Sequence, residues 1–181
     1  MGSKASINGR LFLAALPDRE TAARIFHLGG VLKRAHKFSG KLIAPDRLHV
    51  SLFFVGALPL DKVCAVRREG IGEMRMPPFE VSFDRTASFR SSEGSYPFVL
   101  IGGDGLSRLK SFRQGLGAEL TREGLRSVAN TNFEPHVALL YDARCVEEYP
   151  LAEPISWTVH EIVLVQSMNG HAHIAKWRLR A

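Results

Sequence analysis

The chain contains little cysteine and no long apolar run, and each scarcity argues against a class of protein. Its 181 residues include two cysteines, Cys64 and Cys145, which are isolated and form no C-x-x-C pair. We interpret both as buried free thiols, which fits a reducing cytoplasm. No segment approaches the roughly 20 apolar residues of a membrane span, and the N-terminus lacks the apolar core of a secretory signal. We therefore expect a cytoplasmic protein without a membrane partner.

The overall composition is that of an ordinary globular protein with a basic surface. Hydrophobic residues make up 45% of the chain and charged residues 23%, and this length suits one compact domain or two small lobes that share a core. The net charge of +6 favours an anionic partner through long-range attraction. The basic residues are scattered, however, so the charge alone does not identify that partner.

Alternating apolar patterns and helical stripes occur along the whole chain and predict an α+β fold. Asp18 is placed to cap the first helix. Gly102–Gly105 lacks the spacing of either nucleotide-binding glycine motif and predicts a turn into a helix. The expected helices are one after Asp18, Leu60–Met76 and Leu106–Leu120. The expected strands are Arg10–Leu16, Leu48–Val55, Phe79–Phe83, Phe98–Ile101, His136–Tyr141, Trp157–Gln166 and His173–Leu179.

One four-residue pattern occurs twice, as His49–Leu52 and as His136–Leu139. Side chains alternate faces in a strand, so each pattern offers an imidazole and a small residue, Ser51 or Ala138, to one face of a sheet. Two imidazoles, one neutral and one protonated, are sufficient for metal-free acid–base chemistry at phosphorus. Two such strands, if they face each other, would put two histidines across a groove.

The flanks of both patterns resemble the 2'-5' RNA ligase family of two-histidine phosphoesterases, whose bacterial members resemble RNA 2',3'-cyclic phosphodiesterases. The resemblance extends from about Arg10 to Arg178. It implies a bilobal α+β fold in which residues 1–181 form a single domain of two pseudo-symmetric lobes. Each lobe would be a duplicated strand–helix–strand unit with an antiparallel sheet, facing a central cleft. The stretches that carry the resemblance are Arg10–Pro17, Pro45–Gly56, Phe133–Tyr141 and Leu164–Ser167.

The resemblance also implies a monomeric enzyme that acts on RNA or oligonucleotide ends. This enzyme would need neither a metal nor a cofactor. It would hydrolyse a terminal 2',3'-cyclic phosphate to a 2'-phosphate, with a reverse capability to form 2'-5' linkages. By resemblance, His49 is the general acid that protonates the departing ribose O3', and His136 is the general base that acts on water. Ser51 would hold a phosphoryl oxygen.

Two positions depart from the family pattern. Ala138 stands where Thr or Ser is usual, so one hydrogen bond to a charged group is missing, which is worth about 1.5–3 kcal/mol. Tyr141 stands where many relatives have Arg, so a phosphate-binding charge must come from elsewhere. Tyr141 and Phe12 are candidates for stacking on the terminal base. The candidate phosphate-binding cations are Arg10, Lys41, Arg47, Arg90 and Lys176.

The remaining histidines and serines are assigned no chemistry. His171–His173 has no carboxylate or cysteine partner and predicts a hairpin turn that leads into a strand, not a metal site. We interpret His27, His36 and His160 as surface or structural residues, and no serine lies in a G-x-S-x-G motif. Two alternatives stay open. One is a phosphodiesterase for 2'-5' oligonucleotides or small cyclic nucleotides, and the other is a catalytically weakened RNA-binding module, which Ala138 makes conceivable.

Overall fold

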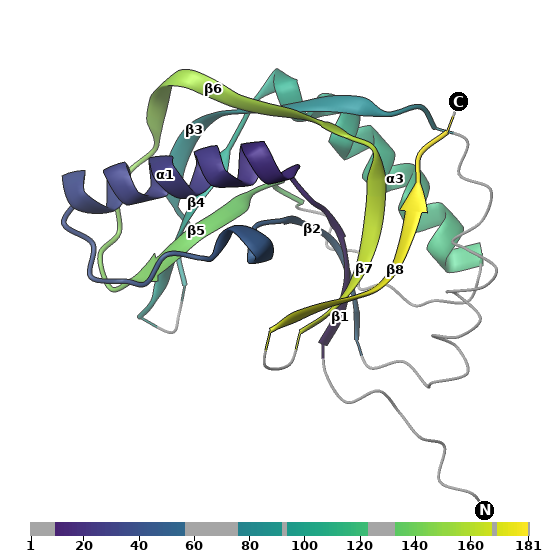
Figure 1. Ribbon diagram of the computed structural model, residues 1–181, viewed down its shortest axis with the longest axis horizontal. Helices are drawn as coiled ribbons and strands as arrows, with labels where there is room; N and C mark the ends of the chain where they lie inside the picture. Colours follow the sequence, from purple (N-terminus) through teal and green to yellow (C-terminus); the bar gives the residue numbers. More distant parts are fainter. Residues whose placement is uncertain (1–9, 57–75, 92–93, 123–132, 168–169, 181) are drawn as a thin grey trace, which may run out of the picture.

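The computed structural model describes residues 10–56, 76–91, 94–122, 133–167 and 170–180. Within these ranges, eight strands form one sheet in the order β6-β3-β4-β5-β2-β1-β7-β8 (Figure 1). Every recorded strand pairing is antiparallel, and the predicted α+β class is confirmed. The strands are β1 (Arg10–Ala15), β2 (Val50–Gly56), β3 (Phe79–Ser88), β4 (Tyr96–Ile101), β5 (Val137–Asp142), β6 (Tyr149–Val159), β7 (Glu161–Ser167) and β8 (His171–Arg178).

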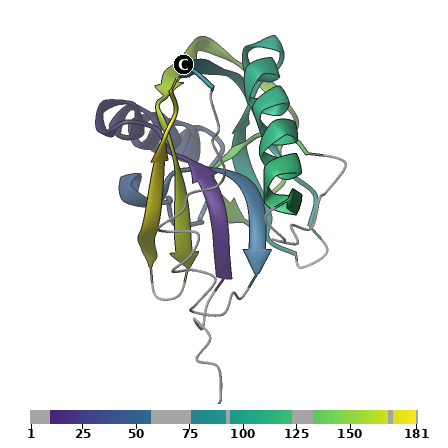
Figure 2. The same cartoon turned by 90° about the vertical axis from the view of Figure 1, so that its right-hand side faces the viewer.

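The sheet consists of two four-stranded halves that meet at its centre. One half is β6-β3-β4-β5 and the other is β2-β1-β7-β8. Figure 2 faces the second half and shows its strands side by side. The halves are joined through β2 and β5, where the recorded register is the single pair Val50 and Val137. The halves carry one histidine motif each. Division of residues 1–181 into two pseudo-symmetric lobes stays a prediction.

Two α-helices are described, and both begin where the sequence predicts a start. Helix α1 (Arg19–Ala35) follows Asp18, whose side chain accepts a hydrogen bond from the Thr21 backbone N–H at 2.8 Å. This contact satisfies one of the free N–H groups of the first turn. Helix α3 (Ser107–Arg122) follows the short 3-10 turn η2 (Asp104–Leu106), so the glycine-rich stretch is a turn into a helix as predicted. A second 3-10 turn, η1 (Pro45–Arg47), precedes β2.

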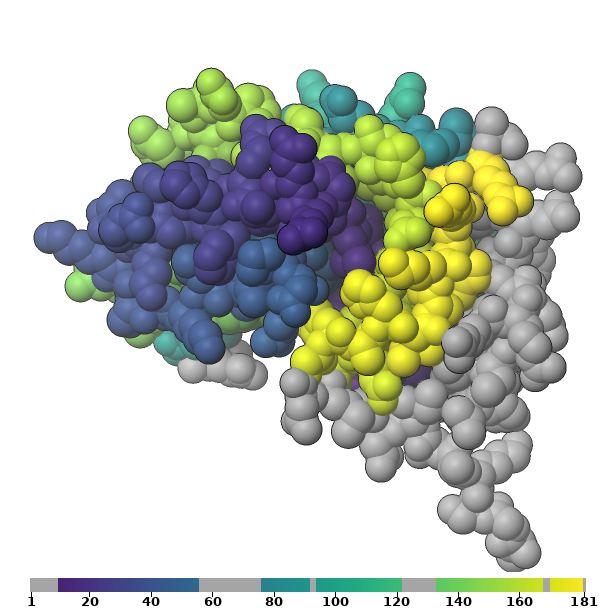
Figure 3. All heavy atoms as spheres, viewed as in Figure 1, coloured from purple at the N-terminus to yellow at the C-terminus, as the bar shows by residue number. Residues whose placement is uncertain are grey.

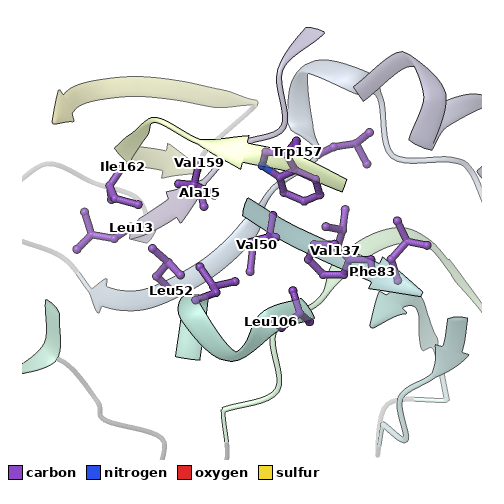
Figure 4. Packing of buried hydrophobic residues seen from close by; sticks show 14 of the residues in the cluster. Leu13, Ala15, Val50, Leu52, Phe83, Leu106, Val137, Trp157, Val159 and Ile162 are labelled. Atoms are coloured by element: carbon purple, nitrogen blue, oxygen red, sulfur yellow. The ribbon is translucent and has the colours of Figure 1, made fainter. Parts of the chain in front are cut away.

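The main core lies between the helices and one face of the sheet, and strand alternation leaves the opposite face for the histidines. Val50, Leu52, Val137 and Leu139 are all buried in the main core (Figure 4). Because alternate side chains point to opposite faces, the residues between them point away from that core. Each motif therefore directs its imidazole and its small residue to the other face.

Small apolar clusters line that other face of the sheet. In β1, Phe12 and Ala14 pack with Val163 and Val165 of β7, apart from the main core. On the other half of the sheet, a similar cluster of buried residues comprises Ala87, Val99 and Ile101, with Phe89 and Ala138 packed against it. These clusters give the two histidine motifs an apolar floor.

Several expectations differ from the structure. The predicted strand Trp157–Gln166 is wrong, because the chain breaks at exposed His160 and forms two strands, β6 and β7. The His160 carbonyl accepts a hydrogen bond from the Leu179 N–H at 2.8 Å, so the break is fixed by the end of β8. Cys145 is exposed rather than buried. Cys64 and the helix predicted up to Met76 fall on residues 57–75, outside the described ranges. None of the described helices is long and apolar enough to cross a membrane.

Candidate active site

The two motif histidines meet where the halves of the sheet join. His49 immediately precedes β2 and His136 immediately precedes β5. The antiparallel pair Val50–Val137 sets a register that places His49 opposite Ala138 and Ser51 opposite His136. Side chains at such paired positions have Cβ atoms roughly 4.5–5.5 Å apart. Each imidazole therefore lies across from the small residue of the other motif.

Both imidazole rings are held in the same way. The Nδ1 atom of His49 lies 2.7 Å from the carbonyl oxygen of Arg47, and Nδ1 of His136 lies 2.9 Å from the carbonyl oxygen of Glu134. Because a carbonyl oxygen can only accept, Nδ1 carries a proton in both rings. The Nε2 atom of each ring is thereby left for acid–base chemistry.

Three side chains surround the half-buried ring of His49. Its Nε2 is 3.0 Å from the Ser51 hydroxyl oxygen, and its ring centroid is 4.8 Å from Phe12 and 5.0 Å from His171. Burial lowers the pKa of His49 to about 4, and the charges of His171 and His136 act in the same direction. The hydrogen bond to the Arg47 carbonyl opposes the shift. His49 is therefore neutral at pH 7, and its Nε2 accepts a hydrogen bond from the Ser51 hydroxyl.

His136 is packed differently. The edge of its ring meets Phe89, with the ring centroids 4.9 Å apart. Glu134, whose carbonyl holds the ring, pairs through its carboxylate with Lys110 of α3 at 3.5 Å. Phe89 was not among the predicted site residues, because nothing in its local sequence marks a residue that supports a remote histidine.

A pocket of about 360 Å³ brings both motifs together. It contains every site residue predicted from the sequence, as well as two of the five predicted phosphate-binding cations, Arg10 and Arg47. Among the described residues no carboxylate lines it, so this lining is neutral or basic. The lining residues are Arg10, Phe12, Ile43, Arg47, His49, Ser51, Phe54, His136, Ala138, Tyr141, Ser167 and His171.

The predicted aromatic and basic residues differ in whether their side chains are available to a ligand in the pocket. Tyr141 is 51% exposed and offers an open ring, whereas Phe12 is 7% exposed and packs against His49. Phe12 therefore packs as part of the surroundings of His49, and of these two aromatic rings it is Tyr141 that is exposed to a ligand. Of the other predicted cations, Lys176 pairs with Glu161 at 3.1 Å, and neither Lys41 nor Arg90 lines the pocket.

His171 is a further residue of the pocket that the sequence reasoning missed. The predicted hairpin is present, since β8 begins at His171 after Gly170 and pairs with β7. Its ring nevertheless reaches the pocket and lies 5.5 Å from Phe12. Burial lowers the pKa of His171, and the charges of Arg47 and His173 add to the effect. Only the curvature of the sheet brings this strand to His49, and a local pattern does not encode that curvature.

Two further observations bear on the choice of site. A larger hollow of about 620 Å³ lies between α1 and β6, but it is mostly apolar and holds one histidine, His27. In the described ranges, no group of three or more His, Cys, Asp or Glu side chains is placed to hold a metal ion. The pocket that both imidazoles line is therefore the candidate active site.

Comparisons with known proteins point to one family. A family model described as the 2'-5' RNA ligase superfamily matches residues 17–171. The chain is 27% identical over 131 residues to a protein from Archaeoglobus fulgidus that is named RNA 2',3'-cyclic phosphodiesterase. The aligned residues cover 72% of this chain and 70% of that protein.

Solved structures give the same picture. The apo structure of E. coli LigT is 28% identical, covers 96% of this chain and 98% of its own, and superposes with a TM-score of 0.72. LigT has also been solved with 3'-AMP and with phosphate. The protein TT0787 of Thermus thermophilus is 22% identical, covers 95% of this chain and 98% of its own with a TM-score of 0.68, and shares the fold.

Proposed function

The chain belongs to the 2'-5' RNA ligase superfamily, and on that premise we propose that it hydrolyses terminal 2',3'-cyclic phosphates of RNA to 2'-phosphates. The observation that carries this proposal is the pair of imidazoles that are held alike through Nδ1 and line one basic pocket. An acid and a base on either side of one phosphorus atom are what this reaction requires.

The proposed reaction uses one proton transfer from each ring. Nε2 of His136 removes a proton from water while the water oxygen forms a bond to phosphorus. The bond between phosphorus and O3' breaks, and Nε2–H of His49 donates its proton to the departing O3'. The phosphate then stays on O2', and the two histidines have exchanged protonation states, which solvent restores.

The acid role assigned to His49 requires that the substrate itself changes the site. With a pKa of about 4, the His49 ring is protonated in too few molecules at neutral pH. A phosphate anion beside Nε2 favours the charged imidazole and raises that pKa. The Ser51 hydroxyl, no longer needed as a donor to Nε2, can then donate to a phosphoryl oxygen.

The relatives support the substrate class. The A. fulgidus relative is named for action on RNA 2',3'-cyclic phosphate, and the LigT structures hold a nucleoside monophosphate and phosphate. We extend this chemistry to a reverse ligation, in which the 5'-hydroxyl of another strand replaces water. Water is present in great excess, so hydrolysis is expected to dominate.

The test is to incubate the protein with RNA that ends in a 2',3'-cyclic phosphate, in excess chelator, and to separate 2'- from 3'-monophosphate products. A positioned proton transfer contributes about 10²–10⁴-fold, so His49→Gln and His136→Gln should each reduce kcat by that order. His160→Gln is the matched control, because His160 is exposed between β6 and β7 and does not line the pocket. Activity that disappears with chelator, or that survives in His136→Gln, would refute the mechanism.

One observation favours a second candidate, a weakened RNA-binding module. Ala138 lies opposite His49 and lacks the hydroxyl that is usual in the family. Binding of the cyclic-ended RNA without any product after long incubation would identify this alternative. A substrate panel that includes 2'-5' oligonucleotides and small cyclic nucleotides separates the remaining phosphodiesterase activities.

A further inference from the structure

Three pocket residues outside the histidine motifs form a row across three neighbouring strands. Arg10 of β1 pairs with Ser167 of β7, and Ser167 pairs with His171 of β8. All three line the pocket. Directly paired residues of antiparallel strands point to the same face of the sheet. The side chains of Arg10, Ser167 and His171 therefore stand next to one another, and this row forms one wall of the pocket.

This row begins at the proposed catalytic centre and leads outward. Neighbouring strands lie about 4.8 Å apart, so β2 and β8 would be separated by roughly 14 Å in a flat sheet. The rings of His49 and His171 are nevertheless 5.0 Å apart, because this half of the sheet curls. Figure 3 shows the yellow β8 atoms against the blue segment that contains η1. The row therefore extends from His49 to Arg10, which is exposed at the rim.

The wall carries positive charge that is available to a ligand. Among the described residues, neither the Arg10 nor the Arg47 guanidinium has an ion pair. The charge of Asp46 raises the pKa of His171, whereas the charges of Arg47 and His173 lower it. Guanidinium, hydroxyl and imidazole groups in a row are all donors to phosphate oxygens. The wall is thus suited to an anion other than the one held between His49 and His136.

The size of the pocket indicates where that anion comes from. Its volume of about 360 Å³ is at the lower end of the roughly 300–1,000 Å³ of small-molecule sites, which leaves room for one nucleotide. The next charged group of a bound oligonucleotide is the phosphodiester that joins the terminal nucleotide to its neighbour. We propose that Arg10, Ser167 and His171 bind this phosphodiester, so that the preferred substrate contains at least two nucleotides.

This inference rests on the proposed function for the identity of the terminal group, and a binding experiment separates the two. Isothermal titration calorimetry at fixed salt compares three ligands: adenosine 2'-monophosphate, a diadenylate with a terminal 2'-phosphate, and the same diadenylate with an uncharged methylphosphonate linkage. We expect the charged diadenylate to bind about tenfold or more tightly than either other ligand, since one hydrogen bond to a charged group is worth that factor.

The variant Arg10→Gln should reduce the ratio of affinities between the charged and uncharged diadenylates about tenfold. Lys176→Gln is the matched control. It removes one positive charge from β8, but Lys176 pairs with Glu161 and does not line the pocket. The control should keep the wild-type ratio, because the ratio cancels general attraction between the protein and RNA.

Each outcome decides the proposal. Equal binding of the two diadenylates would assign any preference to the second nucleoside and overturn the subsite, as would an unchanged ratio in Arg10→Gln. A ratio that falls in Arg10→Gln and not in Lys176→Gln would establish the subsite, even if cyclic-ended RNA is never hydrolysed. In that case the proposed reaction fails and the subsite stands.

Discussion

Anion binding and protonation of His49 should be coupled, and the coupling can be measured without turnover. The pKa of His49 is about 4, primarily because of burial. At pH 7 about one molecule in a thousand therefore carries a proton on this ring. An anion bound beside Nε2 should restore the pKa toward its ordinary value near 6.5 or above.

The magnitude follows from these two values. If the anion returns the pKa from about 4 to about 6.5, the charged imidazole and the anion are coupled by on the order of 3 kcal/mol. Affinity for the anion should then rise nearly tenfold for each pH unit as the pH falls from about 6 to about 4.5. Sulfate is the suitable probe, because it stays a dianion over this range and does not itself titrate.

The same shift predicts the stability of the free protein. The unfolded chain holds the His49 proton more tightly than the folded one does, so stability should decrease as the pH falls from about 6.5 to about 4. The loss from this group is on the order of 3 kcal/mol. Saturating sulfate should offset it, since sulfate favours the protonated folded state.

Nuclear magnetic resonance titration of the histidine Cε1–H signals provides the assay, with His49→Gln for assignment. We expect the His49 signal to titrate near pH 4 without sulfate and at least one pH unit higher with it. Titration near pH 6.5 in the sulfate-free protein would refute the reasoning. So would a pKa that sulfate leaves unchanged, because His49 could then not serve as the acid at neutral pH.

Three substitutions test the surroundings of the site. Ala138→Thr should raise kcat/KM about ten- to a hundredfold in steady-state assays, since its hydroxyl would lie opposite His49 and add a bond worth about 1.5–3 kcal/mol; no gain would mean that the hydroxyl is not missed. Phe12→Ala should admit water beside His49, which packs against it, and raise its pKa in the same titration. Gly40→Ala should lower the thermal unfolding midpoint, because a Cβ there would meet the Tyr141 carbonyl oxygen; an unchanged midpoint would contradict that contact.

The central part of the fold and the face on which the motif residues lie were predictable because they depend on local rules. A period of two in β2 and β5 places Val50 and Leu52 in the core and therefore His49 and Ser51 on the opposite face. Asp18 caps α1 for an equally local reason. The resemblance to the family added the pairing of the two motifs, which spacing alone does not give.

The features that were not predicted from the sequence depend on contacts between distant parts of the chain. No pattern near Phe89 or His171 shows that either ring will contact a motif histidine, because those contacts join separate strands. The break at His160 escaped prediction for a similar reason. Its flanks are rich in the β-branched and aromatic residues typical of one strand, and the His160 carbonyl accepts a hydrogen bond from Leu179, which is distant in the sequence.

The two histidines are held alike but surrounded differently, and in the proposed reaction these surroundings decide which is acid and which is base. His49 lies among Phe12, His171 and Ser51, whereas His136 contacts Phe89. A group that gains its charge only when an anion binds has a role that depends on the substrate. In this pocket that group is His49. Its acid role therefore requires an anion within reach of Nε2, and a neutral ligand of the same shape should leave it unprotonated at pH 7.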